Sequence, residues 1–143
     1  MPADAICAAG FVFSAAAGMC HGKNGERMTN IDFAKMDGLV PVVVQDNGNG
    51  DLLMVGFANP EAYKLTLDSG YVTFFSRTRQ KLWMKGETSG NRLRVISAAT
   101  DCDNDCLLFR VEVEGDGLVC HEGTRSCFTK NIEVQPAATG VTR

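Results

Sequence analysis

The sequence predicts a small α+β domain, mainly β, with one short helix. Its 143 residues, of which 45% are hydrophobic and 22% charged, are typical of one soluble globular domain with a core of its own. Several short runs of β-branched and aromatic residues are separated by turn residues, which indicates strands. A single segment carries both the start and the stop signals of a helix.

The elements follow one another in a regular order. Residues 39–45 and 52–57 are apolar, and the Asp/Asn/Gly-rich residues 46–51 between them predict a β-hairpin. Asn59 as N-cap, Pro60 at the first helical position and Gly70 as a stop predict a helix of about residues 60 to 69. Strands are then expected at 71–76, 82–85, 92–99, 107–113 and 132–134.

The domain is expected to cover residues 31–135, between an extension of residues 1–30 and a C-terminal tail of residues 136–143. The apolar run from Ala5 to Cys20 lacks the basic residues of a secretory signal and is too short to span a membrane. We therefore expect the extension to be poorly ordered or outside the domain, with Cys7, Cys20 and His21 as bystanders, and no association with a membrane.

Charge and cysteine content restrict the function further. Lys and Arg total 14 against 17 Asp and Glu, for a net charge of -3, so no broad basic surface is available for nucleic acid. Six cysteines are too few for a disulfide scaffold in a chain of this length. The sequence therefore favours metal ligation or thiol chemistry in a reducing, cytoplasmic setting.

Three carboxylates stand close together at Asp101, Asp103 and Asp105. In an extended segment they would project to one face and Cys102 and Cys106 to the other. An all-oxygen set suits a hard ion such as Mg²⁺, although a solvated acidic turn is an equally good interpretation. An EF-hand is excluded, because Cys106 replaces the glycine of its sixth position and residues 107–113 alternate like a strand.

Cys120 and Cys127 form a second cluster, with His121 beside the first thiol. Thiolates bind zinc, and a catalytic zinc site uses three protein ligands with a fourth position open to water. Cys102 could complete such a set. A closed four-ligand site that includes His121 or Cys106, or two buried free thiols, would explain the same spacing.

Residues 76–91 form a basic and polar segment in an otherwise acidic chain. They include Arg77, Arg79, Lys81, Lys85 and the single tryptophan, Trp83. Guanidinium groups and hydroxyls bind phosphate, and Trp83 offers a face for a base. A solvated hairpin anchored in the core by Trp83 is the alternative.

Three blocks together resemble the phosphoribosyl-AMP cyclohydrolase family: residues 76–91, residues 101–105 and residues 120–128. The resemblance covers about residues 31 to 130. It implies an intertwined homodimer and a metal-dependent hydrolase with Zn²⁺ and Mg²⁺. The implied reaction is the third step of histidine biosynthesis. It opens the adenine ring of 1-(5-phosphoribosyl)-AMP between N1 and C6 by a zinc-activated water, to give the phosphoribosylformimino-aminoimidazole carboxamide ribotide.

The resemblance also implies residue roles. Cys102 of one subunit and Cys120 with Cys127 of its neighbour would bind zinc, and Asp101, Asp103 and Asp105 would bind magnesium. The chemistry of an imidazole next to Cys120, and not the resemblance, makes His121 the expected catalytic proton shuttle, with a supporting role or a fourth ligand as alternatives. The implied substrate-binding residues are Ser76, Arg77, Arg79, Trp83, Lys85, Gly86, Glu87, Thr88, Ser89 and Arg125.

The chain departs from the family pattern at three positions. The family usually has glycine at Asn104, a small residue at Cys106 and arginine at Thr124. Asn tolerates unusual backbone angles, so Asn104 is acceptable. We expect that Cys106 is not a zinc ligand, because an extended strand would put it about 13 Å from Cys102.

Two rival functional classes share parts of this pattern. A zinc nucleobase deaminase should carry H-x-E and P-C-x-x-C, and neither motif occurs. A non-enzymatic, metal-stabilised nucleotide-binding module remains the alternative function. Because no phosphoribosyl-ATP pyrophosphohydrolase segment is recognisable after residue 130, we expect the stand-alone cyclohydrolase.

Overall fold

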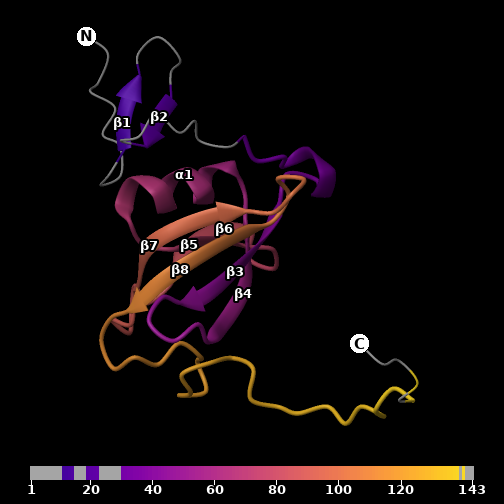
Figure 1. Ribbon diagram of the computed structural model, residues 1–143. Coiled ribbons are helices and arrows are strands. Elements are labelled where there is room, and N and C mark those ends of the chain that lie inside the picture. The colour runs from indigo at the N-terminus through magenta and orange to yellow at the C-terminus, as the bar shows by residue number, and fades with distance from the viewer. Residues whose placement is uncertain (1–10, 15–18, 23–29, 139, 141–143) are drawn as a thin grey trace.

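The computed structural model describes residues 11–14, 19–22, 30–138 and 140. These residues contain one α-helix and eight strands, which confirms the predicted class of a small, mainly β domain with a single helix. Figure 1 shows the helix packed beside the strands, with the segment after the last strand leading away from them. None of the described helices is long and apolar enough to cross a membrane.

The main sheet has four strands in the order β4-β3-β8-β7. They are β3 (Val40–Asp46), β4 (Leu52–Ala58), β7 (Leu93–Thr100) and β8 (Leu107–Val113). β3 and β4 form the predicted hairpin, and β7 and β8 form a second antiparallel pair. The two hairpins join through a parallel pairing of β3 with β8, in which Val42 lies opposite Leu107.

Alternation along β3 places every second residue in the core. Val40, Val42 and Val44 are fully buried, as a half-buried strand requires. The same alternation carries Asp46 to the core face, where the residue is only 8% exposed. The core is completed by apolar residues of β4, β8 and the elements after the helix, among them Leu53, Val72, Phe74, Leu93, Phe109 and Val111.

The helix α1 (Pro60–Ser69) begins and ends where the sequence predicts. The Asn59 side chain accepts a hydrogen bond of 2.8 Å from the Ala62 amide, and Gly70 takes a left-handed conformation with φ 78°. After the helix in the chain, β5 (Thr73–Ser76) and β6 (Lys81–Met84) form a two-stranded hairpin. Phe74 of β5 packs so closely on Gly56 that a Cβ there would come within 2.5 Å of the ring.

Two regions differ from the prediction. The expected strand at 132–134 is wrong: Ile132 and Val134 are 87% and 81% exposed and have no paired neighbour. A short apolar run forms a strand only when another strand is available to pair with it. Within the predicted extension, β1 (Phe11–Ser14) and β2 (Met19–Gly22) pair antiparallel as a separate sheet, which the sequence analysis did not predict.

Candidate active site

A cavity of about 910 Å³ lies between the β5–β6 hairpin with its following turn and the segment after β8. The first wall, formed by the hairpin and its turn, carries most of the residues predicted to bind substrate. The second wall, formed by the segment after β8, carries Cys120, His121 and Cys127. The predicted site residues that line this cavity are Ser76, Arg79, Trp83, Lys85, Gly86, Glu87, Thr88, Ser89, Cys120, His121 and Cys127.

The first wall is shaped by a tight turn after β6. Gly86 has φ +81°, and a Cβ there would come within 2.3 Å of the Asn91 backbone, so only glycine fits. Gly90 donates a hydrogen bond of 2.8 Å to the Gly86 carbonyl, which closes the turn. Asn91 then accepts a hydrogen bond of 2.9 Å from the Asp116 amide. This bond ties the basic wall to the loop that leads into the thiol wall.

The second wall is a folded loop that brings the two thiols together. The amides of Val119 and Cys120 both donate to the Thr124 carbonyl, at 3.1 and 3.0 Å. The Cys127 amide donates to the Leu53 carbonyl of β4 at 2.8 Å. As a result, Cys120 and Cys127 are neighbours, and each thiol influences the pKa of the other.

The two thiols differ in their ease of ionisation. Hydrogen bonds from the Glu122 backbone and from the Thr124 hydroxyl lower the pKa of Cys120. Desolvation raises the pKa of Cys127, and the neighbouring Cys120 raises it further. His121 is exposed and lies at the same cavity. The site thus combines two adjacent soft ligands with a side chain able to carry a proton.

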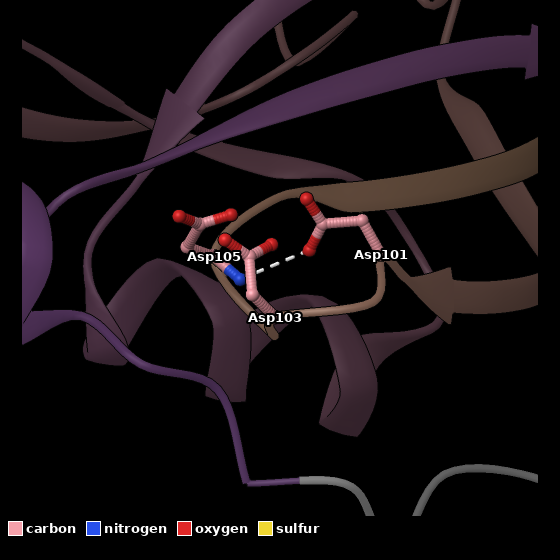
Figure 2. A group of neighbouring side chains, drawn as sticks. All are labelled: Asp101, Asp103 and Asp105. Carbon is pink, nitrogen blue, oxygen red and sulfur yellow. Dashed lines mark hydrogen bonds between the residues drawn. The ribbon is translucent and has the colours of Figure 1, made fainter.

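The three aspartates lie on a turn between β7 and β8, not on an extended segment. The turn is closed by hydrogen bonds from the Asp101 amide to Cys106 and from the Asn104 amide to Asp101, at 3.2 and 3.3 Å. Asn104 has φ 62°, which confirms that asparagine is acceptable there. Figure 2 shows the three carboxylates gathered around this turn. One oxygen of each lies within 4.8 Å of the others.

This geometry corrects the reason for the expected clustering. The carboxylates converge because the chain reverses, and Asp101 also accepts hydrogen bonds of 3.0 and 3.2 Å from the amides of Asp105 and Cys106. The argument that an extended strand separates Cys106 from Cys102 by about 13 Å is therefore wrong. That Cys106 is not a zinc ligand stays a prediction.

A lysine already neutralises part of this acidic cluster. The Lys35 ammonium lies 3.1 Å from a carboxylate oxygen of Asp103 and 3.4 Å from one of Asp105. The hydrogen bond to Asp103 raises the pKa of Lys35, and the same bond lowers the pKa of Asp103. Desolvation and the neighbouring Asp103 raise the pKa of Asp105. No local pattern marks Lys35 as a partner of this turn, since it lies almost seventy residues before it.

Cys102 lies on the aspartate turn and is exposed. Among the residues described, only the three aspartates form a set of three or more metal-ligating groups in mutual reach, so Cys102 is not assembled with Cys120 and Cys127 in one chain. The aspartate turn (residues 101–105) precedes β8, and the loop that carries Cys120 and Cys127 (residues 117–127, the thiol loop) follows it. The turn and the loop therefore lie at opposite ends of a seven-residue strand, which spans about 20 Å.

Two predicted substrate-binding arginines are placed elsewhere. The Arg77 guanidinium stacks on the Phe57 ring at 3.9 Å and borders a smaller cavity of about 200 Å³. Arg125 forms an ion pair with Asp46. Neither is among the residues that line the larger cavity. Met54 and Leu118 also line the cavity and were not predicted, whereas Lys81 and Asn91 line it within the predicted segment 76–91 without having been named individually.

Comparison with known proteins gives a consistent result. A sequence model described as phosphoribosyl-AMP cyclohydrolase matches residues 54–129. The chain is 54% identical to a phosphoribosyl-AMP cyclohydrolase of Solibacter usitatus over 104 residues, which cover 73% of this chain and 82% of that protein. It is 56% identical to the histidine biosynthesis bifunctional protein HisIE of Escherichia coli over 103 residues, which cover 72% of this chain and 50% of that protein.

These matches identify an enzyme, and within the enzymes a hydrolase of histidine biosynthesis. The chain spans about half the length of the bifunctional relatives that it matches. The chain belongs to the phosphoribosyl-AMP cyclohydrolase family.

Proposed function

We propose that this protein hydrolyses the N1–C6 bond of phosphoribosyl-AMP in the cytoplasm, as the third step of histidine biosynthesis. The observation that carries the proposal is the single cavity in which Cys120, His121 and Cys127 face the basic loop of residues 76–91. A phosphorylated nucleotide needs cationic and hydroxyl groups for its phosphates, and Arg79, Lys85, Thr88 and Ser89 supply them. Cys102, Cys106, Cys120 and Cys127 are free thiols, which suits a reducing compartment.

The donor set at the cavity fits zinc. Cys120 and Cys127 are adjacent and unoxidised, and two thiolates are soft ligands of the kind that zinc prefers. When bound, zinc would supply a Lewis acid that lowers the pKa of water to near neutrality. His121 would accept or return the proton as water adds to C6 and the C6–N1 bond breaks. Arg79 and Lys85 would hold the phosphates and so keep the ring in place.

The third thiolate would come from a second subunit. Cys102 is exposed on a turn at the far end of β8 from the thiol loop, so one chain cannot supply all three thiols without rearrangement. Phe128, Leu52 and Val55 expose apolar surface, at 61%, 44% and 45%; Phe128 directly follows Cys127, and the Leu52 carbonyl accepts a hydrogen bond from Ser126. We therefore propose a homodimer with zinc sites shared between its subunits, a state in which such exposed apolar side chains become buried.

Magnesium would be held by Asp101, Asp103 and Asp105. Three carboxylate oxygens within 4.8 Å of one another fit a hard cation. There the ion would balance the charge of substrate phosphate. Because Lys35 already contacts two of these carboxylates, a divalent cation must compete with its ammonium group.

The substitution Lys35→Gln should therefore tighten binding of Mg²⁺ or Mn²⁺. Removing one competing charge at this solvent-screened site should lower Kd by a few-fold at most. Calorimetric titration with Mn²⁺ measures the change, with Lys64→Gln as a control on an exposed face of α1. Equal or weaker affinity in the Lys35→Gln protein would mean that Lys35 supports the metal site instead of competing for it.

The activity is tested directly with the purified protein. Incubation with phosphoribosyl-AMP should change the ultraviolet spectrum of the purine as its ring opens, and a strong zinc chelator should stop the change. Re-addition of zinc should restore it. If zinc-loaded protein binds the nucleotide but leaves its spectrum unchanged, the alternative of a non-enzymatic nucleotide-binding module is correct.

A further inference from the structure

Arg125 lies inside the thiol loop, but its side chain points to the β3–β4 hairpin. Its guanidinium forms an ion pair with Asp46, donates to the Gly117 carbonyl at 3.3 Å and lies 4.0 Å from a carboxylate oxygen of Asp51. We propose that the Arg125–Asp46 pair is a clasp that positions Cys120 and Cys127, so that Arg125 is a positioning residue for the thiol pair and not a phosphate ligand. The part of this inference that concerns metal affinity rests on the proposed zinc role of those thiols.

Asp46 is built to receive this arginine. Strand alternation carries its side chain to the core face, where it is 10% exposed. One carboxylate oxygen accepts hydrogen bonds of 2.8 and 2.9 Å from the amides of Gly48 and Asn49. The other oxygen faces Arg125. A carboxylate this buried needs a cationic partner, and it is held in place independently of the thiol loop.

The thiol loop is held to the sheet at both ends, and Arg125 adds a link between them. At the distal end, the Ser126 hydroxyl donates to the Leu52 carbonyl and the Cys127 amide donates to the Leu53 carbonyl, each at 2.8 Å. These bonds fix Cys127 but do not reach Cys120. The start of the loop is held by the bond from the Asp116 amide to Asn91 and by the Arg125 contact to Gly117, three residues before Cys120. Because Arg125 is also paired with Asp46, its guanidinium joins the start of the loop to the β3–β4 hairpin, which is the hairpin that fixes Cys127.

The first experiment uses metal-free protein, in which the rates of alkylation of individual cysteines are followed by mass spectrometry. Arg125→Gln should increase the rates at Cys120 and Cys127 severalfold and leave Cys102 unchanged as an internal reference. Asp46→Asn keeps the acceptor for Gly48 and Asn49 but removes the charge that pairs with Arg125, and should have the same effect. Arg94→Gln, which breaks the exposed pair of Arg94 with Glu112, should change neither rate.

The second experiment measures zinc affinity by competition with a chromophoric chelator. Arg125→Gln should weaken binding about tenfold, the size of effect expected when support behind a metal ligand is lost. Arg125→Lys should recover part of the affinity, and combining Arg125→Gln with Asp46→Asn should cost no more than either change alone. Circular dichroism checks that each protein is folded. If Arg125→Gln does not fold, the two single variants Arg125→Lys and Asp46→Asn test the proposal in its place.

Unchanged alkylation rates and unchanged zinc affinity in the folded variants would overturn the clasp. If Arg125→Gln weakened nucleotide binding but left the alkylation rates and the zinc affinity unchanged, Arg125 would be a phosphate-binding residue and not a positioning residue. Failure of the proposed function has a different signature: the unmodified protein would then bind no zinc or leave phosphoribosyl-AMP intact, while the metal-free alkylation comparison would still decide the clasp.

Discussion

Replacing Cys127 by serine is expected to remove bound zinc and to slow phosphoribosyl-AMP hydrolysis about 10³-fold or more. A serine hydroxyl is a poor zinc ligand, and loss of the main electrostatic group at an active site costs on this scale. The fold should survive, because the Cys127 contact with β4 is made by the backbone amide and not by the sulfur. Metal content per chain and the rate of the ultraviolet change are the two measurements.

The matched control is Cys106→Ser, which removes a thiol of the same chain by the same chemical change. Cys106 lies at the end of the aspartate turn, where burial and the three aspartates raise the pKa of its thiol. Zinc content and rate should both stay close to those of the unmodified protein. Loss of zinc from the Cys106→Ser protein would instead make Cys106 a ligand and refute the proposed set of three.

Mixing two inactive proteins is expected to restore activity if the zinc sites are shared. A Cys102→Ser subunit keeps Cys120 and Cys127, and a Cys127→Ser subunit keeps Cys102. A mixed dimer then holds one complete site and one site that keeps only Cys120. Random exchange makes half of all dimers mixed, so about one quarter of the full activity should return.

The control for this mixture pairs Cys120→Ser with Cys127→Ser. Both substitutions damage the same half of the site, so no combination of these subunits yields three thiolates around one ion. Subunit exchange is followed by native mass spectrometry with one protein isotopically labelled. Exchange without recovery in the first mixture would mean that each chain assembles its own site.

The sequence was a good guide to elements defined by local chemistry. The helix is bounded by the Asn59 cap and the Gly70 stop, and the hairpin by the turn at 46–51, because these signals act over a few residues. It was a poor guide to the segment at 132–134, whose apolar residues resemble a strand but have no neighbouring strand to pair with. Strand formation depends on a partner, which local composition does not reveal.

The candidate site divides in the same way. The basic loop and the thiols of Cys120 and Cys127 could be predicted, and the structure brings them to one cavity. The contacts of Lys35 with the aspartate turn and of Arg125 with Asp46 link residues 68 and 79 positions apart, respectively. Such pairs are set by the topology of the sheet, and no pattern in a single sequence marks them.

The parallel pairing of β3 with β8 governs how the chain can be made. β3 leaves the ribosome with β4 as its only early neighbour, and its other edge stays unsatisfied until about 65 further residues have been added. Closing so long a loop is slow. Nascent chains that stop short of β8 should therefore expose an unpaired edge of β3, which can pair with other chains. Truncation before residue 107 should yield aggregates in place of a smaller soluble domain.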